Sequence, residues 1–184
     1  MSSPTLDSIR QKVDDAVLCV PDFPKPGILF RDIMPIFKQP KLVSNICSAV
    51  ASHLRESFPH GITAIAGLEA RGFLFGPQIA ILLDCIFVPI RKLGKLPGAT
   101  IKASYVKEYG VDTVEIQQGI LSPNDTVVIV DDLIATGGTM RAAMEVIEAT
   151  QAKVIECFVL IELEALEGVK VLPEHCNFVT LLKH

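Results

Sequence analysis

The chain alternates short apolar runs with segments of helical periodicity. Val127 to Val130 is a continuous run of β-branched residues, which is typical of a strand covered on both faces in a parallel sheet. The next segment repeats apolar residues at the i, i+3, i+4, i+7 spacing of an amphipathic helix: Met140, Ala143, Met144 and Ile147. The order along this stretch is therefore strand, connecting loop, helix.

The same alternation continues along the chain. Further strands are predicted over residues 62–66, 86–90, 153–163 and 178–182. Helices are predicted over residues 5–18, 41–58 and 73–83, and a hairpin is expected between residues 100–106 and 114–117. Strands that alternate with helices indicate an α/β fold, a doubly wound and mainly parallel sheet of about five strands, in one domain over residues 1–184.

One segment breaks this pattern. Residues 20–40 contain five prolines and one glycine, which exclude a long helix and favour an ordered extended loop. The apolar residues of this loop need a surface to lie on. On residue types alone, a structural loop packed over the core and a loop with a functional role explain residues 20–40 equally well.

Composition restricts the kinds of partner. With 184 residues, of which 49% are hydrophobic, the chain can bury a core without disulfides. The net charge of −4 argues against general nucleic-acid binding, so positive charge must be local to a site. The first residues lack the apolar stretch of a signal peptide, and the longest apolar window, residues 79–90, is too short to span a bilayer. We therefore expect a cytoplasmic protein that does not enter membranes.

The cysteines and histidines indicate neither disulfides nor a structural metal. The five cysteines are odd in number and include no C-x-x-C pair, so we expect reduced and mostly buried thiols. The four histidines show no metal-ligand spacing. No direct protein ligand to a metal is firmly predicted.

The loop after residue 130 carries the most specific chemistry. Asp131 and Asp132 follow the apolar run, and Ala135 to Thr139 reads A-T-G-G-T before the helix. Adjacent glycines, threonine hydroxyls and the N–H groups of a helix N-terminus together favour a bound phosphate. Carboxylates beside it would accept hydrogen bonds from sugar hydroxyls or help to hold a divalent ion. A phosphosugar would satisfy both halves, although two glycines in such a place are often an ordinary turn.

Two other predicted strands are also followed by charged residues: Glu69, Arg71, Arg91, Lys92 and Lys95. Basic residues in a loop are usually a solvated surface. In an open α/β sheet, however, ligands bind outside the carboxyl ends of the strands, so these groups can converge on one pocket with the acidic pair.

Several motifs in order resemble one family. They are PDFPKPGILFRDI at 21–33, AGLEARGFLFGP at 66–77, RKLGKLPG at 91–98, ASYVKEYG at 103–110 and VDDLIATGGTM at 130–140. The last resembles the phosphoribosyl-pyrophosphate loop of type I phosphoribosyltransferases, and the whole set is similar to the adenine-specific branch of that family. The resemblance implies the type I phosphoribosyltransferase fold, with an N-terminal hood over residues 20–40 and a flexible catalytic hairpin, or lid, over residues 96–118. It also implies a Mg²⁺-dependent reaction of adenine with 5-phosphoribosyl 1-pyrophosphate to give AMP and pyrophosphate, carried out by a homodimer.

The resemblance also implies roles for individual residues. Ala135, Thr136, Gly137, Gly138 and Thr139 would hold the 5-phosphate, and Asp131 and Asp132 the ribose hydroxyls. Four basic residues would face the pyrophosphate: Arg71, Arg91, Lys92 and Lys95. Leu29, Phe30 and Arg31 would bind adenine, with Phe30 against the purine face. Glu108 and Tyr109 would be catalytic residues on the lid, and the Glu69–Ala70 peptide would be a cis non-proline bond.

Two alternatives remain open. A non-catalytic sensor of phosphoribosyl pyrophosphate would share the fold, but it would be expected to lose the lid or the basic cluster, and this sequence keeps both. An enzyme of the same class acting on xanthine or a 6-oxo purine is the second alternative. Adenine is favoured because its donor and acceptor edge is the reverse of that of a 6-oxo purine.

Overall fold

The computed structural model describes residues 4–107 and 110–184. It divides the chain into two compact units, Met1–Ser57 and Phe58–His184. The predicted hood, residues 20–40, belongs to the first unit. The predicted hairpin and the loop after residue 130 belong to the second.

The first unit contains two helices, a strand pair and a 3₁₀ turn. Its elements are α1 (Leu6–Asp14), β1 (Leu18–Pro21), β2 (Leu29–Asp32), η1 (Met34–Lys38) and α2 (Pro40–Ser57). Helix α1 begins at a capping box in which the side chain of Thr5 accepts from the N–H of Ser8. Strands β1 and β2 pair antiparallel, and helices α1 and α2 pack together.

The strand pair differs from the extended loop expected for residues 20–40. The prolines of this segment stand where they disturb no ladder: Pro21 ends β1, Pro24 and Pro26 lie in the connection, and Pro35 lies in the first turn of η1. Prolines are tolerated at strand ends and in turns. A dense set of prolines therefore excluded a helix here but not a short ribbon.

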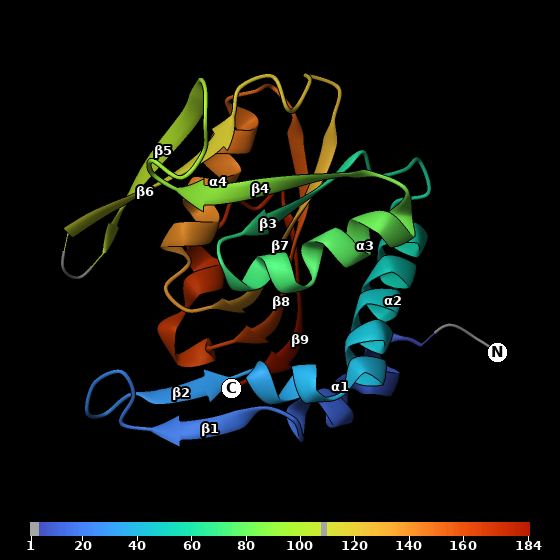
Figure 1. Cartoon of the computed structure of the whole chain (residues 1–184), viewed down its shortest axis with the longest axis vertical. Helices are drawn as coiled ribbons and strands as arrows, with labels where there is room; N and C mark the ends of the chain where they lie inside the picture. The colour runs from blue at the N-terminus through green and yellow to red at the C-terminus, as the bar shows by residue number, and fades with distance from the viewer. Residues whose placement is uncertain (1–3, 108–109) are drawn as a thin grey trace. The chain divides into compact units, whose positions relative to one another are not determined.

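The second unit is built on a seven-stranded sheet (Figure 1). Its strands are β3 (Ala64–Leu68), β4 (Ile86–Lys92), β5 (Thr100–Lys107), β6 (Gly110–Gln117), β7 (Thr126–Ile134), β8 (Lys153–Glu162) and β9 (Asn177–Lys183). The order is β5-β6-β4-β3-β7-β8-β9, in which β4, β3, β7, β8 and β9 run parallel and the β5–β6 hairpin joins β4 antiparallel. The prediction of a mainly parallel α/β sheet is confirmed, and the five parallel strands match the expected number.

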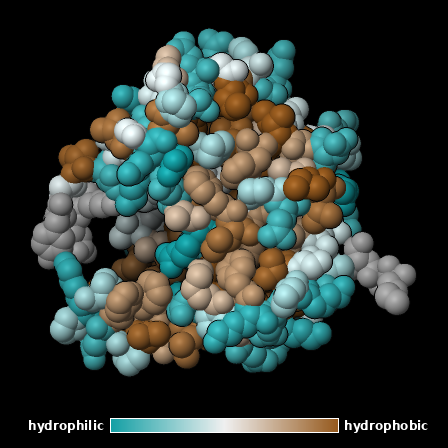
Figure 2. Space-filling view, in the orientation of Figure 1, coloured by the Kyte–Doolittle hydropathy of each residue, from teal (hydrophilic) through white to brown (hydrophobic). Residues whose placement is uncertain are grey.

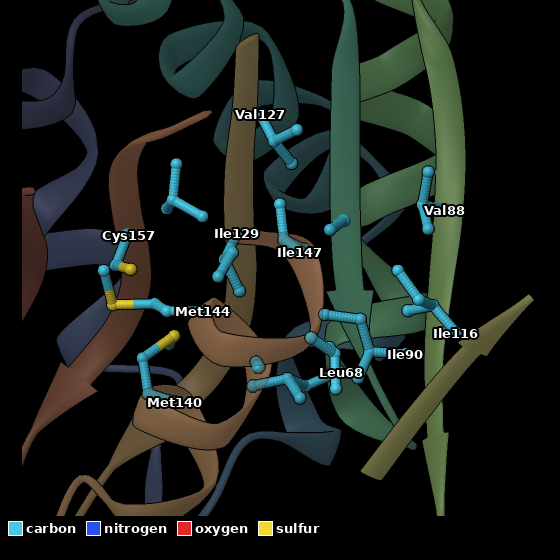
Figure 3. Close-up of a cluster of buried hydrophobic side chains, with 14 of the residues drawn as sticks. Leu68, Val88, Ile90, Ile116, Val127, Ile129, Met140, Met144, Ile147 and Cys157 are labelled. Carbon is cyan, nitrogen blue, oxygen red and sulfur yellow. The ribbon is translucent and has the colours of Figure 1, made fainter. Parts of the chain in front are cut away.

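Two helices cover opposite faces of this sheet, α3 (Gly76–Leu83) and α4 (Gly138–Glu148). Figure 3 shows Met140, Met144 and Ile147 of α4 packed against Ile129 and Cys157. Alternate strand residues point the other way. On that face Phe87 lies against Gly76 at the start of α3, where an added Cβ would come 2.5 Å from the Phe87 ring. The shorter elements η2 (Arg71–Leu74), η3 (Glu164–Leu166) and η4 (Gly168–Val171) lie in connections.

Two strands run further than the sequence pattern indicated. Strand β7 does not end at Asp131 but continues to Ile134, because β8 goes on pairing with it through Asp131↔Val159 and Leu133↔Ile161. Strand β4 likewise reaches Lys92, since its last two residues pair with β6. Asp131 and Asp132 therefore belong to strand β7, and Arg91 and Lys92 belong to strand β4. None of the four lies in a loop.

Several apolar side chains are exposed on α3 and β4. In Figure 2, hydrophobic residues gather over α3 and the neighbouring strand. Ile81 and Leu82 of α3 are 78% and 40% exposed, and Ile86 of β4 is 45% exposed. Within the residues that the structure describes, no helix has both the length and the apolar character that crossing a bilayer requires.

Candidate functional site

A cavity of about 520 Å³ opens at the carboxyl ends of β3, β4 and β7 in the second unit. Its walls are residues 69–71, Lys92, Tyr105 and residues 131–140. The cavity therefore brings together the acidic pair, the A-T-G-G-T loop and part of the basic set. This is the position at which open α/β sheets bind ligands.

Ala135 to Thr139, here called the phosphate loop, joins β7 to α4. Gly137 precedes α4 with φ of 80°, a left-handed conformation that favours glycine. The first N–H groups of α4 have no partner within the helix, so they face the cavity with a partial positive charge. A phosphate group is the ligand that suits this arrangement.

The phosphate loop is supported from behind by a segment far away in the sequence. Gly137 and Gly168 approach so closely that a Cβ on Gly137 would overlap the carbonyl oxygen of Gly168, and a Cβ on Gly168 would overlap that of Ala135. Two hydrogen bonds hold the same segment in place. Leu163 N–H donates to Ile134 O at 3.0 Å, and Arg141 Nη1 donates to Val171 O at 3.0 Å.

Gly168 is a site residue that sequence reasoning missed. It lies among ordinary residues of E-G-V-K-V, and only its contact with Gly137 shows that a side chain would not fit. No local pattern reports a contact between backbones so far apart in the chain.

The environment of the acidic pair disfavours its charged form. Burial raises the pKa of Asp131 well above its ordinary value, and the neighbouring charge of Asp132 raises it further. Burial also raises the pKa of Asp132, although Arg71 opposes this rise. Arg71 Nε lies 2.9 Å from Asp132 Oδ2, but within the described part of the chain this oxygen receives no aligned hydrogen bond. The pair therefore has unused capacity for a hydroxyl donor or a cation.

The basic residues divide into two groups. Arg71 and Lys92 line the cavity, whereas Arg91 and Lys95 are not among its lining residues. Arg91 instead forms a two-point ion pair with Glu69, at 3.1 Å from Nε to Oε2 and 3.2 Å from Nη2 to Oε1. The hydrogen bonds from Arg91 lower the pKa of Glu69, so the pair is charged.

Glu115 is a second residue that sequence reasoning missed. It is 2% exposed, and its carboxylate accepts from Lys95 N–H at 3.1 Å, Leu96 N–H at 3.2 Å and Thr100 Oγ1 at 3.0 Å. Burial opposes ionisation, but these hydrogen bonds outweigh it and lower the pKa of Glu115. The ionised side chain thereby ties the turn after β4 to the base of the β5–β6 hairpin.

The predicted lid residues Glu108 and Tyr109 lie outside the described residues. The flanking hairpin is described, and its Tyr105 lines the cavity beside Gly138. The Tyr105 hydroxyl donates to Asp112 Oδ2 at 3.2 Å across the hairpin. The peptide bond between Glu69 and Ala70 is cis, the geometry that the resemblance implied.

The predicted base-binding residues Leu29, Phe30 and Arg31 lie on β2 of the first unit. Leu29 is 48% exposed, and the Phe30 ring meets Phe23 edge-on with centroids 5.0 Å apart. Leu29 pairs with Pro21, which has no N–H, so this pair cannot exchange two hydrogen bonds.

Comparisons with known proteins agree with one another. The phosphoribosyl transferase domain family matches residues 35–180. An adenine phosphoribosyltransferase of Caenorhabditis elegans is 55% identical over 184 residues, which are 100% of this chain and 98% of that protein.

Solved structures give the same result. Adenine phosphoribosyltransferase from Saccharomyces cerevisiae, complexed with adenine and an imino-altritol bisphosphate, is 46% identical with a TM-score of 0.92, over 96% of this chain and 99% of that one. The enzyme from Trypanosoma brucei, in complex with AMP, pyrophosphate and ribose-5-phosphate, is 30% identical with a TM-score of 0.86, over 95% of this chain and 79% of that one.

Replacing Gly168 by alanine should displace the phosphate loop. The added Cβ would overlap Ala135 O, and such overpacking costs about 1–3 kcal/mol of stability. We expect the Kd for ribose 5-phosphate, measured by calorimetry, to rise about tenfold or more, because losing one hydrogen bond to a charged phosphate costs about 1.5–3 kcal/mol and about 1.4 kcal/mol is a factor of ten in Kd. Lys170→Ala is the matched control, since Lys170 lies exposed in the same η4. Unchanged binding by a folded Gly168→Ala protein would show that the contact does not shape the loop.

The acidic pair should make stability depend on pH. A pKa that is higher in the folded protein than in the unfolded chain gives stability that is present below the unfolded pKa, about 4, and is lost as pH rises through the folded pKa. Without ligand, Asp131→Asn should therefore be more stable than the unsubstituted protein at pH 7, and the difference should shrink towards pH 4. Thermal unfolding across this range measures it, and an Asn variant that is less stable at pH 7 would contradict the interpretation.

Proposed function

The chain belongs to the phosphoribosyl transferase family, and from this we propose that it transfers the 5-phosphoribosyl group of phosphoribosyl pyrophosphate to adenine, giving AMP and pyrophosphate. This is a pentosyl transfer of purine salvage. The observation that carries the proposal is that a phosphate loop, an acidic pair and two cations line the same cavity. Each of these groups has a counterpart on phosphoribosyl pyrophosphate.

The 5-phosphate would occupy the phosphate loop. Backbone N–H groups at the start of α4 and the hydroxyls of Thr136 and Thr139 supply donors for its oxygens. The close packing of Gly137 on Gly168 holds these donors in position before the ligand arrives. A preorganised site loses less free energy to ordering when it binds.

The ribose hydroxyls would bind the acidic pair. Asp132 Oδ2 is buried and accepts no aligned hydrogen bond from the described residues, so a hydroxyl donor supplies what that oxygen lacks. Donation to a carboxylate also favours its charged form and reverses part of the raised pKa. The sugar would thus supply the donor that Asp132 Oδ2 can accept.

The pyrophosphate would face Arg71 and Lys92. Negative charge on the pyrophosphate grows as its bond to the ribose breaks, so cations placed in advance stabilise the transition state. Arg91 and Lys95 do not line the cavity, so in this proposal they act indirectly. Arg91 fixes Glu69 and the end of β4, and Glu115 fixes the backbone of Lys95.

Mg²⁺ would be held largely by the substrate. In residues 4–107 and 110–184, no three His, Cys, Asp or Glu side chains are grouped to hold a metal ion. The site nevertheless fits Mg²⁺, which is commonly bound by one or two carboxylates plus substrate phosphates, and Asp131 with Asp132 supplies the carboxylates. When bound, the ion supplies positive charge to the departing pyrophosphate.

Adenine would be read by the backbone of β2 at Leu29 and Arg31. Backbone C=O groups there accept from the C6 amino group and N–H groups donate to N1, while the Phe30 ring covers the purine face. A 6-oxo purine presents the reverse pattern, and an unpaired polar edge costs orders of magnitude in rate. Because each backbone group keeps its role as donor or acceptor, this arrangement favours adenine over a 6-oxo purine.

The β5–β6 hairpin would close over the reacting atoms. The ribosyl transition state is cationic, so exclusion of water matters as much as proton transfer. Glu108 would handle the proton at purine N7, and Tyr109 would cover the reacting centre. Tyr105, which lines the cavity, and its bond to Asp112 support a hairpin that carries groups to this site.

We place the enzyme in the cytoplasm as a homodimer with no nucleic-acid partner. Five free thiols suit a reducing compartment, and the net charge of −4 gives no general affinity for nucleic acid. The exposed apolar side chains of Ile81, Leu82 and Ile86 support contact between copies.

Pyrophosphate release tests the function directly. The purified protein should release pyrophosphate from phosphoribosyl pyrophosphate with Mg²⁺ and adenine, and not with hypoxanthine, guanine or xanthine. Removing Mg²⁺ with a chelator should lower the rate, and adding it back should restore it. Tight binding of phosphoribosyl pyrophosphate without turnover of any base would favour the sensor, and turnover of another base alone would reassign the specificity.

Glu108→Ala tests the proton-transfer role. General acid–base help is worth about 10² to 10⁴ in rate, so kcat should fall by that factor. KM for adenine should change less than kcat. Lys102→Ala is the control, because Lys102 is an exposed residue of the same hairpin. A kcat within about twofold of the original would remove Glu108 from the mechanism.

A further inference from the structure

Two cysteines outside the site lie in direct contact. Cys157 Sγ on β8 and Cys176 Sγ in the turn before β9 are 3.6 Å apart. Cys157 is fully buried, whereas Cys176 is partly exposed. The two thiols belong to the same compact unit and share a hydrogen bond. A small reagent can reach Cys176 because it is partly exposed, and Cys157 lies in contact with it.

We propose that Cys157 and Cys176 form an oxidisable dithiol, a modification site at which a hydroperoxide converts two thiols into one disulfide. In the first step the Cys176 sulfur attacks the peroxide O–O bond, giving a sulfenic acid and releasing an alcohol, or water from hydrogen peroxide. In the second, the Cys157 sulfur attacks the Cys176 sulfur, forms the S–S bond and releases water. Two thiols lose two electrons and two protons, and the peroxide is reduced.

The geometry assigns the order of these steps. Attack on a peroxide needs access and thiolate character, and Cys176 is the exposed member. The hydrogen bond from Cys157 lowers the pKa of Cys176, while burial and the carboxylates of Glu148 and Glu156 oppose this. That hydrogen bond is also the main cause that raises the pKa of Cys157, with burial second, so Cys157 is the less reactive of the two thiols towards a peroxide.

Formation of a disulfide requires the two sulfurs to approach further, and the two cysteines differ in how firmly their backbone is held. A disulfide brings the two sulfurs to about 2.05 Å. Cys157 is fixed within β8, but Cys176 belongs to a turn in which its N–H donates to Pro173 O at 3.2 Å. A turn adjusts its dihedral angles more easily than a central strand, so Cys176 moves towards Cys157.

The disulfide would link the two ends of a segment that supports the phosphate loop. Residues 158–175 lie between the two cysteines and include Gly168 and Val171, which support the phosphate loop. A cross-link removes freedom from the unfolded chain and restricts local opening of the closed segment. We therefore expect oxidation to raise Tm by roughly 5 °C and to slow amide hydrogen exchange over residues 163–176.

The test is oxidation of the purified full chain with hydrogen peroxide, followed by mass spectrometry and non-reducing peptide mapping. The expected product is lighter by about 2 Da, contains a Cys157–Cys176 cross-linked peptide, and reverts with dithiothreitol. Cys176→Ser and Cys157→Ala should each prevent the cross-link. Because Cys157 is buried and its replacement can unfold the protein, Cys176→Ser is the deciding variant.

The double variant Cys19→Ser/Cys85→Ser is the matched control. It removes two thiols that lie elsewhere and should still form the disulfide at the same rate. Gain of oxygen atoms without a cross-link, a cross-link through Cys19 or Cys85, or unchanged hydrogen exchange after oxidation would overturn the proposal.

Discussion

The candidate site depends on one backbone contact, that of Gly137 with Gly168. The phosphate loop has to present N–H groups inward, so nothing on the ligand side can hold it. Support comes instead from the segment after β8, which meets the loop where neither chain has a Cβ and is fastened by hydrogen bonds at Ile134 and Val171. The strand–loop–helix stretch is therefore shaped by residues far along the chain.

Charge in the site is arranged in two layers. The inner layer is Arg71, Lys92 and the acidic pair, which face the cavity. The outer layer consists of acids that organise the surrounding backbone. Glu69, which also borders the cavity, holds Arg91 and Lys92 N–H, and Glu115 holds the N–H groups of Lys95 and Leu96. Glu69 and Glu115 have lowered pKa values because they accept several hydrogen bonds, whereas burial raises the pKa values of Asp131 and Asp132, and the charge of Asp132 raises that of Asp131 further. The contrast separates supporting acids from binding acids.

Most of the fold could be predicted from local pattern. The apolar run at Val127–Val130 and the helical repeat from Met140 are signals of buried strand and amphipathic helix, and both elements are present. Element ends were less predictable. Strand β7 passes through Asp131 and Asp132 because β8 provides partners there, and β1 and β2 pair despite the surrounding prolines. Hydrogen bonding to a neighbouring strand outweighs the local preference of polar residues for loops.

The sequence alone determined the chemistry of the site: an acidic pair, a glycine loop and basic strand ends, each within a few residues of a predicted strand. Local order is enough for this, because the carboxyl ends of neighbouring parallel strands meet at one edge of the sheet. Only the tertiary structure decided which charges face the cavity, with Arg71 and Lys92 inside and Arg91 bound to Glu69. It also decided the roles of Gly168, Glu115 and the Cys157–Cys176 pair. These roles depend on contacts between residues that are far apart in the chain, and no local pattern in a single sequence reports such contacts.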